Sequence, residues 1–128
     1  RVEIMRKALL CDTFIMSSNA VSEDGQLVNI DGNGNRVAAL VYGPRQVIVI
    51  VGVNKFTADL DSAIKRARTI AAPINIQRFT DRDTPCHKLG VCVDCNCNDC
   101  VCNQVLITRR CSPAGRIKVI VVGENLGF

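Results

Sequence analysis

A chain of 128 residues with 48% hydrophobic and 22% charged residues can bury a core as one domain, which excludes a disordered protein. Its net charge of +4 comes from dispersed basic residues, and only 4% of the residues are aromatic, which excludes the basic track and stacking surface of a nucleic-acid-binding protein. No apolar run approaches the roughly 20 residues that span a bilayer, and no signal peptide is recognisable. We expect a cytoplasmic protein that binds neither nucleic acid nor membrane.

The chain is predicted to begin with a helix and two strands. Apolar residues recur at helical spacing within residues 2–10. Because the chain opens inside this helix without a methionine, we expect a fragment of a longer protein. Residues 12–17 and 27–30 have apolar centres typical of strands, and the turn signal Glu23-Asp24-Gly25 precedes the second. We expect these two segments to be neighbouring strands.

The strongest fold signal is the run QVIVIVG at residues 46–52. β-Branched residues fill both faces of this segment, which is typical of a central strand that helices cover on both sides. A short helix is predicted before it, over residues 36–42. An amphipathic helix is predicted after it, over residues 59–71, with Thr57 as its N-cap; Pro73 breaks this helix, and residues 74–79 can resume it.

The C-terminal part of the chain is predicted to hold two more strands. They cover residues 105–108 and 117–122, and a turn at residues 112–115 separates them. Helices that alternate with strands in this way indicate an α/β fold. We expect a single domain over residues 1–128 that is built on one mixed sheet.

Six of the eight cysteines lie within residues 86–102, on a polar loop that we place at residues 80–104. A loop this long in a compact domain is usually functional. Thiols this close together can cross-link, bind a soft metal or react, and in the cytoplasm a metal or redox site is favoured over disulfides. His87 is poorly placed to activate the adjacent Cys86, which disfavours thiol catalysis.

The cysteine spacing decides between the metals that could bind. Cys92 and Cys95 form a Cys-x2-Cys pair, which brings two sulfurs to one side of the chain. The next pair, Cys97 and Cys100, follows too closely for an independent zinc ribbon. The irregular spacing therefore favours an iron–sulfur cluster over zinc, and a metal-free loop stays open as an alternative.

Polar residues also gather near the predicted ends of strands, where α/β proteins bind ligands. The alternative is that these residues only complete turns and helix starts. Arg36 and Lys55 are the strongest candidates, because a cation just outside a buried strand can pair with a carboxylate or a phosphate. We predict a ligand site made of Asn19, Asn33, Asn35, Arg36, Asn54 and Lys55.

Several stretches together resemble the LUD-domain family, named for lactate utilization. They are SSNAVSEDGQLVNIDGNGNRVAAL, YGPRQVIVIVGVNK, DLDSAIKRARTIAAP, TPCHKLGVCVDC and GRIKVIVVGENLGF, and they cover nearly the whole chain. The resemblance implies a three-layer Rossmann-like sheet, as in the related group of ribose-5-phosphate isomerase, glucosamine-6-phosphate deaminase and CoA transferases.

The resemblance also implies a metal site and a missing partner. Similar members carry cysteines that match Cys86, Cys92, Cys95 and Cys102, so any metal is placed on these four, with Cys97 and Cys100 as additions. The N-terminal half of the family has no counterpart here. We therefore expect the missing N-terminal part, or a second copy in a homodimer, to cover an exposed face of the sheet.

Three functions follow from these observations. The resemblance implies a protein of lactate and pyruvate metabolism that works beside an iron–sulfur electron-transfer system. A second reading is a small-molecule-binding or regulatory protein whose cysteine loop is a structural metal site. A third, by fold relationship alone, is an isomerase or transferase on a sugar phosphate or acyl-CoA; a carboxylate opposite Lys55 would support it, and Glu124 is the nearest candidate.

Overall fold

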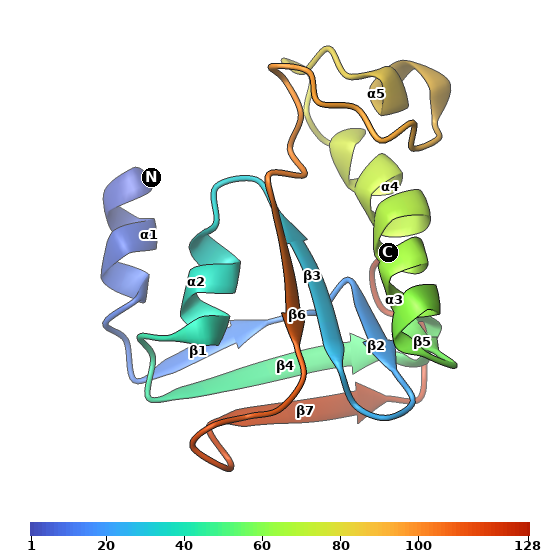
Figure 1. The fold of residues 1–128 in the computed structure, drawn as a ribbon. Helices are drawn as coiled ribbons and strands as arrows, with labels where there is room; N and C mark the ends of the chain where they lie inside the picture. Colours follow the sequence, from blue (N-terminus) through green and yellow to red (C-terminus); the bar gives the residue numbers. More distant parts are fainter.

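A computed structural model describes residues 1–128, whose strands form two sheets (Figure 1). The first sheet is parallel, with the order β1 (Thr13–Met16), β4 (Gln46–Gly52) and β7 (Ile117–Val122). The second is mixed, with the order β5 (Phe56–Thr57), β2 (Ala20–Ser22), β3 (Leu27–Asp31) and β6 (Gln104–Thr108). The predicted α/β class is confirmed, but the strands are divided between two sheets instead of joined in one.

The helices pack around the mixed sheet at its two sides (Figure 1). On one side lie α1 (Val2–Ala8) and α2 (Asn35–Val41). On the other side runs a continuous helical segment made of α3 (Leu60–Arg66), the π-helical turn η2 (Ala67–Ala71) and α4 (Ala72–Ile76). A short helix, α5 (Pro85–Leu89), and a 3-10 turn, η1 (Val53–Lys55), complete the set. None of these helices is long and apolar enough to cross a membrane.

The parallel sheet is covered on one face only. Val47, Val49 and Val51 of β4 are fully buried in the main core cluster, where Leu40 of α2 joins them. On the opposite face, Ile15 of β1 is 62% exposed. The prediction that helices cover β4 on both faces is therefore wrong for these residues. That a further segment or a second copy covers the open face stays a prediction.

The strands over residues 12–17 and 27–30 exist as predicted, but they are not neighbours. β1 pairs with β4, whereas β3 lies between β2 and β6 in the other sheet. The missed element is β2, whose three residues are too few to show a hydrophobic period. It forms a hairpin with β3 through the Glu23-Asp24-Gly25 turn. The strand that pairs with β3 across this turn is therefore β2 and not β1.

The helix after β4 begins and ends differently from the prediction. Asp59, not Thr57, is its N-cap, and the Asp59 carboxylate accepts a hydrogen bond from the Ser62 N–H at 2.7 Å. The helical segment also continues past Pro73, which lies in the first turn of α4. Proline has no N–H to donate, and the π-helical turn η2 that precedes it lets the chain pass without a break.

This helical segment packs small side chains against the mixed sheet. Ala63 and Ala67 are fully buried against Ala20, Val28 and Ile30 of the hairpin β2–β3. The chain then leaves α4, passes through α5 and the cysteine-rich segment beyond the end of the sheet, and returns through β6 (Figure 1). Residues of the loops after β1 and β3 and of the cysteine-rich segment line one cavity.

Candidate functional site

Two cavities contain most of the predicted site residues. The large cavity, of 780 Å³, is lined by Asn19, Asn33, Asn35, Arg36 and Lys55, and also by Ser17, Ser18, Asp31, Arg78 and Arg82. The cysteine cavity, of 70 Å³, is lined by Cys86, Cys92, Cys95, Cys100 and Cys102. Five of the six predicted ligand-binding residues and all four predicted metal ligands therefore lie on one of the two cavity walls.

Lys55 is the most unusual residue of the large cavity. It follows β4 on the turn η1, and only 3% of its surface is exposed. Its ammonium group donates a hydrogen bond to the main-chain oxygen of Phe128, the last residue of the sequence, and no Asp or Glu side chain forms an ion pair with it. Burial, and then the positive charges of Arg66 and Arg36, lower the pKa of Lys55. Buried charges normally have an opposite charge beside them, and no Asp or Glu side chain supplies one to Lys55.

A second buried cation lies next to Lys55. Arg66 of α3 is 8% exposed, and its guanidinium donates to the main-chain carbonyls of Asn54, at 2.8 Å, and of Asn19. Burial lowers the pKa of Arg66. Main-chain oxygens accept hydrogen bonds from both cations, and no Asp or Glu side chain forms an ion pair with either.

Arg36 and Asp31 form the start of α2 at the cavity wall. The Asp31 carboxylate accepts hydrogen bonds from the main-chain N–H groups of Arg36, at 2.9 Å, and of Val37, at 3.3 Å. It therefore caps the helix after Gly34, whose φ of 79° suits a residue without a side chain. The Arg36 guanidinium donates to the Ile30 carbonyl at 2.8 Å and lies 3.6 Å from the Asp31 carboxylate.

The predicted amide residues divide into two groups. Asn33 and Asn35 line the large cavity from the loop before α2 and from its first residue. Asn19 also lines it, but its side-chain oxygen accepts a hydrogen bond from the Ile30 N–H at 2.8 Å. Asn54 does not line the cavity; its side chain bonds to the main chain of Leu126 and Gly127, at 3.0 and 3.1 Å, and holds that segment in place.

Sequence reasoning missed two arginines that line the large cavity. Arg78 and Arg82 follow α4, and the Arg82 guanidinium lies 3.7 Å from the Asp99 carboxylate of the cysteine-rich segment. The buried Nε of Arg82 has no hydrogen-bond partner. No local pattern marks these residues, because their place depends on how the chain turns after Pro73. The cavity thus has five basic lining residues (Arg1, Arg36, Lys55, Arg78 and Arg82) and two acidic ones (Asp31 and Asp81).

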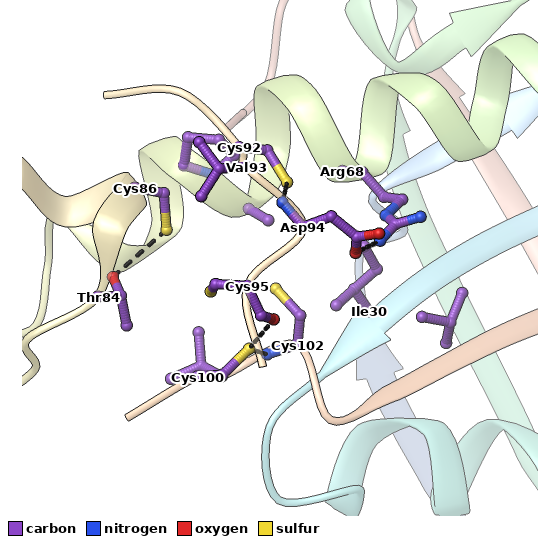
Figure 2. A pocket seen from close by; sticks show the side chains of 14 residues that line it. Ile30, Arg68, Thr84, Cys86, Cys92, Val93, Asp94, Cys95, Cys100 and Cys102 are labelled. Atoms are coloured by element: carbon purple, nitrogen blue, oxygen red, sulfur yellow. Dashed lines mark hydrogen bonds and ion pairs between the residues drawn. The ribbon is translucent and has the colours of Figure 1, made fainter. Parts of the chain in front are cut away.

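The cysteine cavity lies between α5 and the start of β6 (Figure 2). Cys86 belongs to α5, where its sulfur lies 3.3 Å from the Thr84 hydroxyl, and Cys102 lies just before β6. Asp94, between Cys92 and Cys95, has a φ of 53° and forms an ion pair with Arg68 of η2. Figure 2 shows this ion pair at the edge of the cavity, where it ties the segment to the helix.

The thiols of this cavity hinder one another's ionisation. Burial raises the pKa of Cys102 to about 12, and the thiols of Cys100, Cys86 and Cys92 add to the effect. Burial also raises the pKa of Cys95 to about 11, with hydrogen bonds from Cys100 and Cys97 as further causes. Cys97 lies 3.9 Å from Cys95 but does not line the cavity.

The donor set fits a thiophilic metal in kind and number, because four or more thiols face one small space. Their positions do not form a coordination shell: no group of three or more His, Cys, Asp or Glu side chains lies close enough to hold an ion. Metal binding would therefore require the thiols of the cysteine-rich segment to move closer to one another. Cys100, treated as an addition in the sequence, lines the cavity, and His87 does not.

One comparison with known proteins identifies a family. The family model described as LUD domain matches residues 1–122, which is nearly the whole chain. No curated protein and no solved structure shows significant similarity to the chain.

Proposed function

The chain belongs to the LUD-domain family, a family of lactate utilization, and from this premise we propose that it binds a small organic acid such as lactate or pyruvate in the large cavity. The observation that carries the proposal is Lys55, a buried ammonium group on the cavity wall that no Asp or Glu side chain neutralises. A bound carboxylate would supply the negative charge that the site is missing.

The balance of charge around the cavity supports an anionic ligand. Arg36 adds a second cation to the wall near Lys55, and Arg78 and Arg82 add two more lining cations. The two acidic residues offset these charges only in part. Asp31 already accepts hydrogen bonds from the start of α2, so its carboxylate is engaged. A carboxylate and a phosphate share the chemistry that this arrangement recognises.

The size of the cavity bears on the class of ligand. A volume of 780 Å³ is in the range that holds drug-sized ligands, so a three-carbon acid would occupy only part of it. A phosphorylated or acyl compound would also fit. An isomerase or transferase would need a base beside such a ligand, yet Glu124 does not line the cavity, Asp31 is engaged, and the other acidic lining residue, Asp81, is exposed to solvent. Binding of an organic acid is therefore our first choice.

We also propose that the cysteine cavity holds a metal, either as zinc or as an iron–sulfur cluster. Cys86, Cys92, Cys95, Cys100 and Cys102 would supply the ligands. A cluster would supply single-electron transfer, as the link to an electron-transfer system requires, whereas zinc would leave a binding or regulatory protein with a structural metal site. Anaerobic purification with iron, sulfide and zinc analyses separates these cases, and free thiols without metal would refute both.

Isothermal titration calorimetry tests the anion proposal. L-Lactate, pyruvate and inorganic phosphate are each titrated into the protein at pH 7, and glycerol serves as an uncharged control of similar size. We expect saturable binding of at least one anion with one site per chain, and no heat of binding with glycerol. Because the interaction is between charges, the affinity should fall as salt is added. Absence of binding by all three anions would contradict the proposal.

A further inference from the structure

The two cavities are neighbours and share part of their walls. Four residues line both of them: Ile30, Ala72, Val101 and Cys102. Two of these, Val101 and Cys102, belong to the end of the cysteine-rich segment. A change in the position of this segment therefore changes the wall of the large cavity as well.

Hydrogen bonds join the same segment to the loop that begins α2. The Asn103 N–H donates to the Asp31 carbonyl at 3.1 Å, and the Asn103 side-chain amide donates to the Gly32 carbonyl at 3.1 Å. Gly32 also lies close to Val101, because a side-chain carbon on it would be only 3.2 Å from the Val101 carbonyl. This loop carries Asn33 and leads into Arg36, so the cysteine-rich segment supports one wall of the large cavity.

The cysteine-rich segment also contacts Arg82, another residue that lines the large cavity. Asp99, between Cys97 and Cys100, lies 3.7 Å from the Arg82 guanidinium and accepts a hydrogen bond from the Asp83 N–H at 3.0 Å. Arg82 lines the large cavity, whereas Asp99 lines neither cavity. The cysteine-rich segment thus contacts both Arg82 and the loop before α2.

We propose that a thiophilic metal bound in the cysteine cavity increases the affinity of the large cavity for its anion. The proposal rests on the proposed function and adds its regulation. The segment between α5 and β6 has no regular structure, and its thiols must draw together to hold an ion. A metal that fixes this segment would reduce the conformational entropy that the shared wall loses when the anion binds, and so would favour anion binding.

Thermodynamic linkage makes the effect reciprocal. If Zn²⁺ tightens anion binding by some factor, the anion must tighten Zn²⁺ binding by the same factor. We expect a factor of about 5 or more, which is in the usual range for coupled sites. The structure also names residues whose loss should remove the coupling without removing a lining residue: Asp99 and Asn103.

The experiment measures the pyruvate dissociation constant by calorimetry in metal-free and Zn²⁺-loaded protein, with inorganic phosphate in its place if phosphate is the anion that binds. A competing chelator gives the Zn²⁺ affinity with and without the anion. Asp99→Ala and Asn103→Ala should keep both ligands but bring the ratio of anion affinities towards one. Asn98→Ala, an exposed residue of the same segment, is the matched control and should keep the full ratio.

The outcomes separate the coupling from the sites on which it depends. Tighter anion binding in the Zn²⁺-loaded protein, with the same factor in both directions, supports the proposal. Equal or weaker anion binding overturns the coupling alone. Failure of every anion to bind in either form overturns the proposed function and the coupling with it, and failure of Zn²⁺ to bind at one site per chain overturns the coupling but not the anion site.

Discussion

Arg66 is held against Lys55: its Nε donates to the carbonyl of Asn54, the preceding residue, at 2.8 Å, and its charge contributes to the lowered pKa of Lys55. Two buried cations in this position destabilise the ligand-free fold, since no Asp or Glu side chain forms an ion pair with either of them. Proteins keep such arrangements at functional sites, where a ligand supplies the missing charge.

Replacement of Lys55 by methionine should stabilise the ligand-free protein. Methionine fills a similar volume and removes the buried charge, so we expect the free energy of unfolding to rise by about 1 kcal/mol. Urea denaturation monitored by circular dichroism measures this difference. Lys65→Met, at an exposed position of α3, should change stability by less than about 0.5 kcal/mol. A less stable Lys55→Met protein would show that the bond to the Phe128 carbonyl is a structural requirement.

Anion binding should depend on pH through Lys55. The pKa of this group lies below the 10.5 of an ordinary lysine, and only the charged form attracts an anion. Affinity should stay constant below the lowered pKa and fall as pH rises through it, with proton uptake on binding in that range because the anion raises the pKa again. Calorimetry between pH 7 and 11, a range that includes the ordinary lysine pKa of 10.5, in buffers of different ionisation enthalpy tests this. A wild-type affinity that does not change with pH would exclude Lys55 from the site.

Cysteine variants should separate metal ligands from bystanders. Cys92→Ser and Cys95→Ser should abolish metal retention after anaerobic purification, as measured by elemental analysis. Cys97→Ser should leave it nearly intact, because Cys97 does not line the cysteine cavity. From the sequence the same was expected of Cys100, but this residue lines the cavity, so Cys100→Ser should reduce retention. Loss of metal in Cys97→Ser alone would reverse the ligand assignment.

Arg116 should be essential for the position of α2. Its guanidinium donates to three carbonyls at the end of this helix, those of Ala39, Leu40 and Pro44, at 2.8, 2.7 and 3.0 Å. Arg116→Ala leaves these acceptors unpaired and should lower the free energy of unfolding by about 2 kcal/mol. Chemical denaturation measures the loss, and the exposed Arg110→Ala is the control. An unchanged stability would mean that water replaces all three bonds.

Elements with a strong local pattern were predictable from the sequence. The strand over residues 46–52 and the helices that flank it follow from hydrophobic period and turn residues. The three residues of β2 show no period, so the hairpin that separates β3 from β1 was not predicted. The sequence predicts a break at Pro73, because the π-helical turn that accommodates the proline leaves no mark in the sequence.

The candidate site was predictable where chemistry is concentrated in one segment. The cysteines and the pair Asn54-Lys55 stand out by residue type and by their place after a strand. Arg66 and Arg82 did not, because a basic residue on a helix or in a loop is usually a solvated one. Only the folded chain buries Arg66 and brings Arg82 to the cavity wall. The contact between the two cavities depends equally on tertiary structure.

The central claim is that Lys55 binds the anion in the large cavity. Its most direct test is the ratio of anion dissociation constants for Lys55→Met and wild-type protein, measured by calorimetry at pH 7 beside the Lys65→Met control. We expect Lys55→Met to weaken binding at least about tenfold, as loss of one charge-assisted hydrogen bond implies, while Lys65→Met binds like wild type. A folded Lys55→Met protein that binds the anion with wild-type affinity would contradict the claim.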